Sequence, residues 1–308
     1  MELSCIRHID PTHLTDFKAD VFITTIGYET RSTSVSRLVE NSSCRKIALV
    51  SKNGIQEFSY KDNSKYFEKN GFEVILVQSE TPKVDAILNA LSGEKINVMI
   101  DCTSMPPFWY YEFFSWFYEK QDGEGKVRMR IIYTMANYVR LPAPRKVKGI
   151  SDFLHTEIKP VNGKKVALIL GLGQEKNVSE SIFKIVQPDL LYLYYADPPV
   201  EKRFVEKVFV NNHKLINETP IRNLVAYPIR NGQSIYQSLI DTILPLRNEY
   251  SIMLIPHGPK IFSVVAMLVH MGYPDIRVSY PVFKKPPVAD RLPCDTPIIL
   301  DILFEGEE

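Results

Sequence analysis

The sequence predicts an α/β protein made of two tandem Rossmann-like domains with mostly parallel sheets. Its 308 residues correspond to about two domains of ordinary size. Short apolar runs rich in β-branched residues alternate with longer amphipathic stretches, which is the pattern of βαβ units. The order of these segments in the first half recurs in the second half, which indicates an internal duplication.

In the first half, each expected strand is a short apolar run followed by a stretch with helical periodicity. We expect strands over residues 21–26, 46–50, 73–77, 96–100 and 127–133, and helices near 33–40, 60–70, 83–91 and 107–119. In the second half, we expect strands over 166–170, 190–195, 224–228, 251–255 and 276–280, and helices near 178–186, 200–211, 234–246 and 262–270. Because helices connect successive strands, both sheets are expected to be mostly parallel.

The two halves correspond loop by loop. The segment FITTIGYETRS matches LILGLGQEKNVS, and VMIDCTSMPP matches MLIPHGPKIF. We place one domain at residues 1–145 and the other at 146–308. Residues 139–164 are rich in Pro, Lys and Gly with weak periodicity, so they are predicted as a linker with room for one short helix. The segments 2–8 and 297–304 are predicted strands that pair with each other or extend a sheet edge, and we assign the C-terminal strand to the second domain.

The composition excludes several classes of protein. The 37 basic and 36 acidic residues leave a formal net charge of +1, which gives no support for binding to duplex DNA or to anionic membranes. The four cysteines are scattered with no CxxC pair, so neither a zinc site nor a disulfide framework is expected. No signal peptide or membrane-spanning run is evident. We therefore expect a cytoplasmic protein with no metal and no membrane partner.

Candidate site residues come from a topological rule. In open α/β sheets, ligands bind beyond the carboxyl ends of the strands where the strand order reverses, which selects the first and fourth strand-to-helix loops of each half. The first loop of the first half contains Gly27, Glu29, Arg31 and Ser32. Gly27 allows a tight turn, Ser32 is a good helix N-cap, and Arg31 could grip a phosphate or carboxylate. The alternative is an ordinary capped helix start with a Glu29–Arg31 pair at the surface.

The matching loop of the second half opens like a dinucleotide-binding fingerprint. Gly171 and Gly173 occupy the first two glycine positions, Glu175 follows, and Lys176 stands at the third glycine position. Asp197 lies 24 residues after Gly173, where such folds place the acid that binds ribose. The missing third glycine counts against NAD or FAD, because that glycine allows the helix to pack closely on the strand, and we expect no such cofactor.

The fourth loops supply further candidates. Asp101 ends an apolar strand, and Thr103 and Ser104 place hydroxyls at the start of the next helix. In the second half, the corresponding loop is His257-Gly258-Pro259-Lys260. The alternatives are an N-cap for Asp101 and a hydrogen-bonded loop histidine for His257. Lys260 at a helix start opposes the helix dipole unless an anion compensates.

These loops resemble the CARF domains, which are Rossmann-like sensors of cyclic oligoadenylates in prokaryotic antiviral systems. Their second motif is a strand ending in Asp or Asn, a Thr/Gly/Lys loop and a helix, written [DN]xTGGTK. Asp101-Cys102-Thr103 matches its start, whereas the residues from Ser104 onward depart from it. His257-Gly258-Pro259-Lys260 keeps a Gly and the Lys. The resemblance implies a nucleotide-like ligand and a function in antiviral defence.

Three functions follow as hypotheses. The first is a nucleotide-binding or cyclic-oligonucleotide-sensing protein with the ligand between the two halves, acting on an effector protein because no effector domain is present in the chain. Arg31 and Lys260 would neutralise phosphate, and removal of either would leave stability unchanged but weaken binding by roughly 1.5–3 kcal/mol. The second is an enzyme that hydrolyses a phosphodiester or glycosidic bond of a nucleotide at the same place with Glu29, Asp101 and His257. The third is a scaffold with degenerate sites.

One segment, residues 108–118 (FWYYEFFSWFY), is unusually aromatic. It is predicted to be a helix buried on more than one face. The alternatives are a platform on which nucleic-acid bases stack and an interface of a homodimer.

Overall fold

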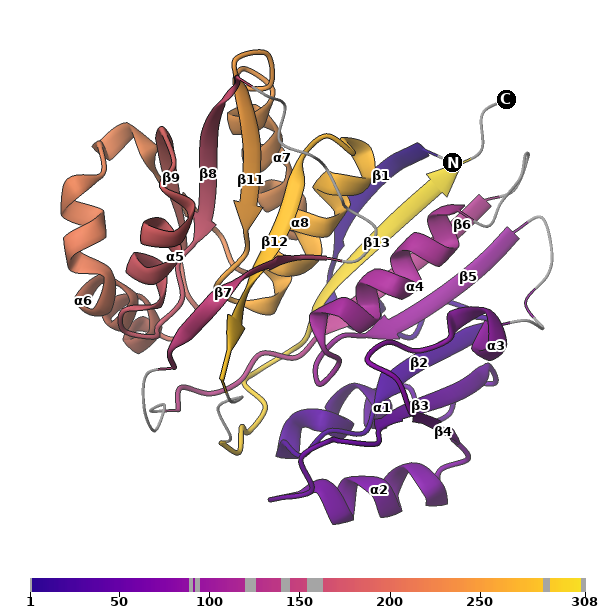
Figure 1. The fold of residues 1–308 in the computed structure, drawn as a ribbon. Helices are drawn as coiled ribbons and strands as arrows, with labels where there is room; N and C mark the ends of the chain where they lie inside the picture. The colour runs from indigo at the N-terminus through magenta and orange to yellow at the C-terminus, as the bar shows by residue number, and fades with distance from the viewer. Residues whose placement is uncertain are drawn as a thin grey trace. The chain divides into compact units, whose positions relative to one another are not determined.

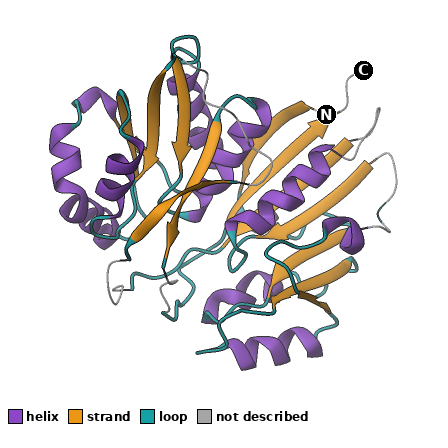
Figure 2. Cartoon of the chain, viewed as in Figure 1, coloured by secondary structure: helices purple, strands orange, loops and turns teal. Residues whose placement is uncertain are grey.

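The computed structural model describes residues 2–88, 91, 95–119, 126–139, 145–153, 163–284 and 289–305. They form two compact units, one made of Met1–Asn137 with Asp290–Glu308 and the other of Tyr138–Ala289 (Figure 1). Figure 2 shows that both contain helices and strands in alternation, as the sequence predicts. The predicted α/β class with two mostly parallel sheets is confirmed.

The sheet of the first unit has the order β1-β13-β6-β5-β2-β3-β4 among the described residues. Strands β2 to β6 are parallel, while β13 is antiparallel to both β6 and β1. Its strands are β1 (Glu2–Ile9), β2 (Val21–Thr25), β3 (Arg45–Ser51), β4 (Glu73–Val77), β5 (Lys95–Asp101), β6 (Lys126–Tyr133) and β13 (Ile298–Glu305). Its helices are η1 (Pro11–His13), η2 (Thr30–Thr33), α1 (Ser34–Leu38), α2 (Tyr60–Lys69), α3 (Val84–Leu88) and α4 (Pro107–Glu119).

The sheet of the second unit has the order β10-β9-β8-β11-β12-β7 among the described residues. All its pairs are parallel except that of β7 with β12. Its strands are β7 (Val147–Asp152), β8 (Lys165–Gly171), β9 (Leu190–Ala196), β10 (Leu224–Tyr227), β11 (Tyr250–Ile255) and β12 (Arg277–Phe283). Its helices are α5 (Val178–Val186), α6 (Lys202–Glu218), η3 (Ile221–Asn223), α7 (Gly232–Ile243) and α8 (Lys260–Gly272).

The two units share one strand order. Five parallel strands follow the sequence 3-2-1-4-5 in each, and an antiparallel strand pairs with the fifth. The strand order therefore reverses between β2 and β5 in the first unit and between β8 and β11 in the second. This common order supports the predicted duplication.

The C-terminal strand differs from the expectation. We assigned it to the second domain, but β13 lies between β1 and β6 in the first unit, beside the N-terminal strand in Figure 1. The expected pairing of the two terminal strands is therefore found, within the first unit. An apolar strand pattern reports burial on both faces and contains no information on which sheet the strand joins.

The segment predicted as a linker contains a strand. Within residues 139–164, the described part includes β7, which pairs with β12 at the edge of the second sheet. Its side chains are mostly half-buried, so its sequence lacks the strong apolar alternation of an inner strand. Residues 140–144 and 154–162 of the expected linker, and residues 89–90 of the helix expected over 83–91, lie outside the described residues.

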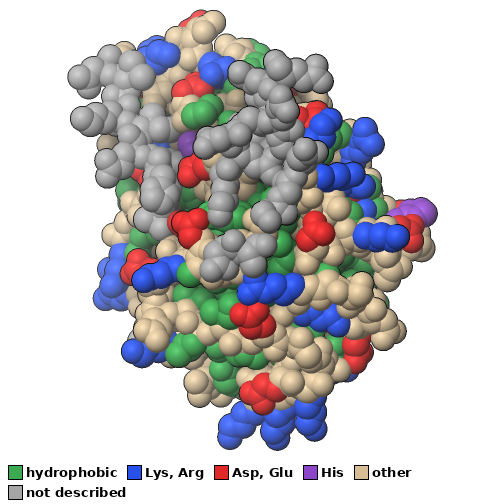
Figure 3. All heavy atoms as spheres, turned by 90° about the vertical axis from the view of Figure 1, so that its right-hand side faces the viewer, with side chains coloured by type: hydrophobic (Ala, Val, Ile, Leu, Met, Phe, Trp, Pro, Cys, Tyr) green, Lys and Arg blue, Asp and Glu red, His purple; other side chains and the backbone are tan. Residues whose placement is uncertain are grey.

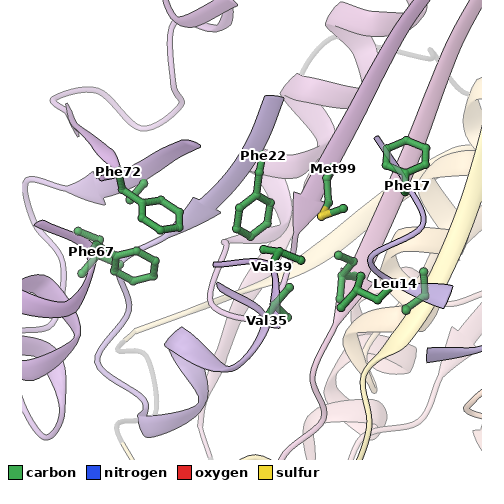
Figure 4. Packing of buried hydrophobic residues seen from close by; sticks show 12 residues of the cluster. Leu14, Phe17, Phe22, Val35, Val39, Phe67, Phe72 and Met99 are labelled. Atoms are coloured by element: carbon green, nitrogen blue, oxygen red, sulfur yellow. The ribbon is translucent and has the colours of Figure 1, made fainter. Parts of the chain in front are cut away.

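Each unit has its own apolar core. In the first unit, Figure 4 shows Phe22, Phe67 and Phe72 packed in a row with Val35 and Val39 of the α1 region. The aromatic helix α4 contributes side chains that are buried on several faces, namely Trp109, Tyr110, Tyr111, Phe113, Phe114 and Phe117. Burial of these rings supports the prediction that the segment is a core helix and not a platform on which bases stack. Among the described residues, no helix is both long enough and apolar enough to cross a lipid bilayer.

Candidate functional site

The first and fourth loops lie against each other in both units, and glycines permit this contact. A Cβ atom added to Gly27 would lie 2.6 Å from the Cβ of Ser104 in the fourth loop. In the second unit, a Cβ on Gly173 would lie 2.8 Å from Nε2 of His257, and a Cβ on Gly171 would lie 2.8 Å from the ring of Phe262. The pair Gly171 and Gly173 thus has a packing function within this chain, which accounts for the partial fingerprint without a dinucleotide.

Substitution of Gly27 by alanine is expected to destabilise the first unit by roughly 1–3 kcal/mol, the range for overpacking. The reason is that the Cβ of Ser104 is fixed to the backbone and can move away only with its loop. Chemical denaturation measures the change. Gly149→Ala is the control, because nothing lies within 4 Å of a Cβ at that position. A second change, Ser104→Gly, is expected to restore stability in part, and equal losses with and without it would contradict the explanation.

An asparagine from the second helix of each unit supports the first loop. The Asn63 side chain, on α2, donates hydrogen bonds to the carbonyl oxygens of Gly27 and Glu29, each at 2.9 Å. In the second unit, Asn212 on α6 donates to the carbonyl oxygen of Gly173 at 3.0 Å. The sequence analysis missed both residues, and it ended the α6 helix at residue 211 although α6 continues to Glu218. Equivalent asparagines at equivalent places further support the duplication.

Arg31 forms the pair with Glu29 that the alternative interpretation proposed, but the pair is buried and not at the surface. Its exposed fraction is 3%, and its Nε donates to Glu29 Oε2 at 2.7 Å while its Nη1 donates to the carbonyl oxygen of Thr134 at 2.7 Å. Burial alone would lower the pKa of its guanidinium, but interactions with Tyr133 and Glu29 outweigh this effect and raise the pKa. The expectation of an exposed Arg31 whose removal leaves stability unchanged is therefore corrected, because the side chain is part of the interior.

The segment that precedes β13 packs on the first loop. The Asp290 carboxylate accepts hydrogen bonds from the backbone N–H and the hydroxyl of Thr30, both at 2.8 Å. The N–H of Arg31 donates to the carbonyl oxygen of Arg291 at 3.2 Å, and the Arg291 side chain lies 3.4 Å from Glu29 Oε1. The sequence analysis did not connect Arg291 with this loop, since 260 residues separate Thr30 from Asp290.

The fourth loop of the first unit is bound to its surroundings through Asp101 and Thr103. Asp101 is 1% exposed and accepts hydrogen bonds from the Thr24 hydroxyl at 3.1 Å and from the Thr103 N–H at 2.9 Å. The Thr103 hydroxyl accepts a hydrogen bond from the N–H of Thr134 at 2.9 Å. Asp101 therefore has the local loop contact that the N-cap alternative proposed, in addition to a contact with the neighbouring strand.

Three buried hydroxyls at this edge have no hydrogen-bond partner within the part of the chain that the structure describes. They are Thr25 Oγ1 at the end of β2, Ser104 Oγ after β5 and Thr134 Oγ1 after β6. Ser32 behaves differently, since its hydroxyl donates to the Thr25 carbonyl and accepts from the Gly27 N–H. The carboxyl ends of three neighbouring strands thus hold unused hydrogen-bonding groups close to the predicted residues.

In the second unit, the loops converge on a histidine with an enclosed ring nitrogen. His257 is half-buried as a residue, but its Nε2 is inaccessible to solvent and has no hydrogen-bond partner among the described residues. Glu175, in the first loop, accepts hydrogen bonds from Nε and Nη2 of Arg145, whose guanidinium carbon lies 3.6 Å from the ring centre of Phe283. Arg145 falls in the segment predicted as a linker, so the sequence analysis missed this partner of Glu175.

Burial lowers the pKa of His257 to about 4, against an ordinary value near 6.5. Glu175 opposes the shift and Arg145 adds to it. The folded protein therefore holds a neutral imidazole at neutral pH. Burial also lowers the pKa of His270, on α8, although a contact with the Ile276 carbonyl oxygen opposes the change.

The lowered pKa predicts acid sensitivity of the second unit. The unfolded chain takes up a proton at His257 near pH 6.5 and the folded chain only near pH 4, so stability is complete above pH 6.5 and falls as the pH approaches 4. At pH 5, the expected loss is about 2 kcal/mol. Urea denaturation at pH 7 and pH 5 measures it. His257→Gln should flatten this dependence, whereas the exposed control His213→Gln should not, and an unchanged slope in His257→Gln would contradict the prediction.

The remaining predicted residues of the second unit are more exposed. Asp197 is exposed at the end of β9, and Gly258 is exposed in the fourth loop. A Cβ on Gly258 would lie 3.1 Å from the Leu172 carbonyl oxygen, so this glycine also serves the contact between the loops. Lys260 begins α8, as expected, and is half-buried.

A pocket of about 390 Å³ lies elsewhere in the first unit. It is lined by His8, His13, Asp16 and Arg128, among others, and by no residue of the first or fourth loop. Within the described ranges, no group of three or more His, Cys, Asp or Glu side chains is arranged to hold a metal ion. Figure 3 shows basic and acidic side chains scattered together over one face, outside the atoms drawn in grey.

Comparison with known proteins adds no family to this description. No protein-family model matches the chain. A search of curated proteins finds no match either. The case for a function therefore depends on the residues themselves.

Proposed function

We propose that the chain binds a nucleotide-type ligand at the carboxyl edge of its first sheet, beside the first and fourth loops of the first unit. The observation that carries the proposal is the concentration of buried polar side chains at this edge. Within the described residues they are Thr24, Thr25, Glu29, Arg31, Ser32, Asp101, Thr103 and Thr134. The hydroxyls of Thr25 and Thr134, and that of the neighbouring Ser104, have no hydrogen-bond partner among the described residues.

A buried polar group without a partner lowers stability, by about 1–3 kcal/mol for each. Folded proteins therefore pair nearly all such groups, and exceptions call for an explanation. Three of these exceptions lie at the carboxyl ends of neighbouring strands, which is the place where doubly wound sheets bind ligands. A ligand rich in hydroxyls and ring nitrogens would complete these hydrogen bonds, which favours a nucleoside or nucleotide over an apolar molecule.

The resemblance of Asp101-Cys102-Thr103 to the CARF motif adds cyclic oligonucleotides to the candidate ligands. On this proposal the protein is a sensor that acts on a separate effector protein in prokaryotic antiviral defence. The second unit, with its paired loops around His257, would contribute an equivalent site.

Isothermal titration with nucleotides and cyclic oligonucleotides tests the proposal. We expect at least one to bind with a dissociation constant below about a millimolar, which corresponds to roughly 4 kcal/mol of binding free energy. Ser104→Ala removes an unpartnered hydroxyl, so it should leave the ligand-free protein equally stable or more stable and should weaken binding. Ser42→Ala is the matched control, because Ser42 is an exposed serine outside these loops. If no ligand in the panel binds, the proposal fails.

Hydrolysis of the ligand is the alternative, and the contacts of the two carboxylates count against it. Glu29 is placed between Arg31 and Arg291, and Asp101 accepts from Thr24 and Thr103. A general base must instead reach the proton that it removes. Incubation of the protein with a bound nucleotide, followed by chromatography, should therefore return the nucleotide unchanged.

A further inference from the structure

The charges at the carboxyl edge of the first unit restrict the kind of ligand. Glu29 pairs with the guanidinium groups of both Arg31 and Arg291, and the Asp290 carboxylate accepts from Thr30 and from the Arg291 N–H beside them. The two carboxylates balance the two guanidinium groups in formal charge, so this cluster has no excess of positive charge. Such an interior would not attract a group with several phosphates.

Arg31 is also unsuited to hold a phosphate. Its Nε and Nη1 are already used by Glu29 and by the Thr134 carbonyl oxygen, and its exposed fraction is 3%. A phosphate could reach it only by displacing Glu29, which would leave that carboxylate buried with the more distant Arg291 as its partner. Leaving a buried charge poorly paired is strongly unfavourable.

Arg291, unlike Arg31, has a guanidinium that is accessible to solvent and only loosely paired. Its side chain is 31% exposed, and its Nη1 lies 3.4 Å from Glu29 Oε1, longer than the 2.7 Å of the Arg31–Glu29 pair. Its backbone is fixed at both polar atoms, since its N–H donates to Asp290 and its carbonyl oxygen accepts from the Arg31 N–H. With its backbone fixed and its guanidinium accessible, Arg291 is suited to bind one anionic group through two parallel N–H···O hydrogen bonds.

We infer that the uncharged nucleoside portion of the ligand enters the first unit, and that one phosphate is held at its rim by Arg291. This inference rests on the proposed function and gives it a ligand class. The unpartnered hydroxyls of Thr25, Ser104 and Thr134 accept and donate hydrogen bonds with the sugar or base. The phosphate remains near solvent, beside a guanidinium that keeps the Glu29 contact until the ligand arrives.

The test is a titration of the full chain with the four common ribonucleosides, their 5′-monophosphates and inorganic phosphate. A nucleoside should bind, its monophosphate should bind more tightly, and inorganic phosphate should not compete at millimolar concentration. Arg291→Gln should weaken binding of the monophosphate by roughly 10- to 100-fold, the range for loss of hydrogen bonds to a charged group, and should leave the nucleoside affinity unchanged.

The matched control is Arg222→Gln, which removes an exposed arginine from η3 of the second unit. It should alter neither affinity. Thermal denaturation of each variant without ligand verifies that both are folded. A monophosphate preference that survives Arg291→Gln would overturn the inference, as would monophosphate binding with no nucleoside binding. Absence of binding by every compound in this titration would also overturn the inference, whereas the proposed function is rejected only if the cyclic oligonucleotides fail to bind as well.

Discussion

Replacement of Arg31 by methionine is expected to lower the free energy of unfolding of the first unit by about 3–5 kcal/mol, the range for breaking a buried ion pair by removing one partner. Methionine keeps much of the side-chain volume but removes the charge that faces Glu29 and the donor that faces the Thr134 carbonyl oxygen. Both groups remain buried, and water cannot replace the lost partner. Chemical denaturation followed by circular dichroism measures the change.

Lys126→Met is the control for Arg31→Met. Lys126 pairs with Glu305 in the same unit, but its side chain is 59% exposed, so we expect a loss of only about 0–1 kcal/mol. The double change Glu29→Gln with Arg31→Met should recover part of the loss, because it removes a carboxylate that only the more distant Arg291 would pair. A small effect of Arg31→Met, close to that of Lys126→Met, would show that this ion pair is not buried in solution.

Replacement of Asp301 by asparagine is expected to destabilise the first unit by a similar 3–5 kcal/mol. Asp301, on β13, accepts hydrogen bonds from Nε and Nη2 of Arg130 at 2.6 and 2.9 Å, and it also pairs with Arg128. Both Asp301 and Arg130 are almost fully buried. Asparagine fits the same space, but it has no charge and offers Arg130 one amide oxygen in place of two carboxylate oxygens, so the guanidinium keeps that oxygen and the carbonyl oxygens of His13 and Leu14 as acceptors but loses its counter-charge.

The matched double change is Asp301→Leu with Arg130→Met, which removes both charges and keeps apolar volume between β13 and β6. It should be more stable than Asp301→Asn, since a buried pair replaced by apolar side chains is often neutral. Asp275→Asn is the exposed control, because Asp275 pairs with Arg247 at the surface of the second unit. Equal losses in Asp301→Asn and Asp275→Asn would contradict the assignment of β13 to this sheet.

The elements of the fold could be predicted because the sequence pattern reports burial directly. The strand β4 and the helices α4 and α5 were predicted with their observed bounds. Each of these segments has a clear change of composition at both ends. α6 was predicted too short, because Asn211 and Asn212 resemble a helix end, whereas both side chains donate to carbonyl oxygens of the first loop.

The arrangement of the site was predicted only in part. The selection of the first and fourth loops followed from the expected strand order, and in both units the observed order reverses beside these loops. The partners of individual side chains did not, because Arg145, Asp290 and Arg291 reach these loops from distant parts of the chain. A sequence pattern that places Arg31 after a strand cannot tell whether a later segment covers it. For this reason the sequence analysis expected Arg31 at the surface, whereas the structure shows it buried.

The position of β13 also has a consequence for synthesis of the chain. The first unit lacks this strand until the whole second unit has left the ribosome, so the usual order, in which the N-terminal domain is completed first, cannot hold. Meanwhile β6 is an open sheet edge. It carries Lys126, Arg128 and Arg130 at alternate positions, and charged side chains on an edge discourage pairing with other chains. Asp301 and Glu305 of β13 later pair with these three side chains, so the charges that protect the nascent edge also select the strand that closes it.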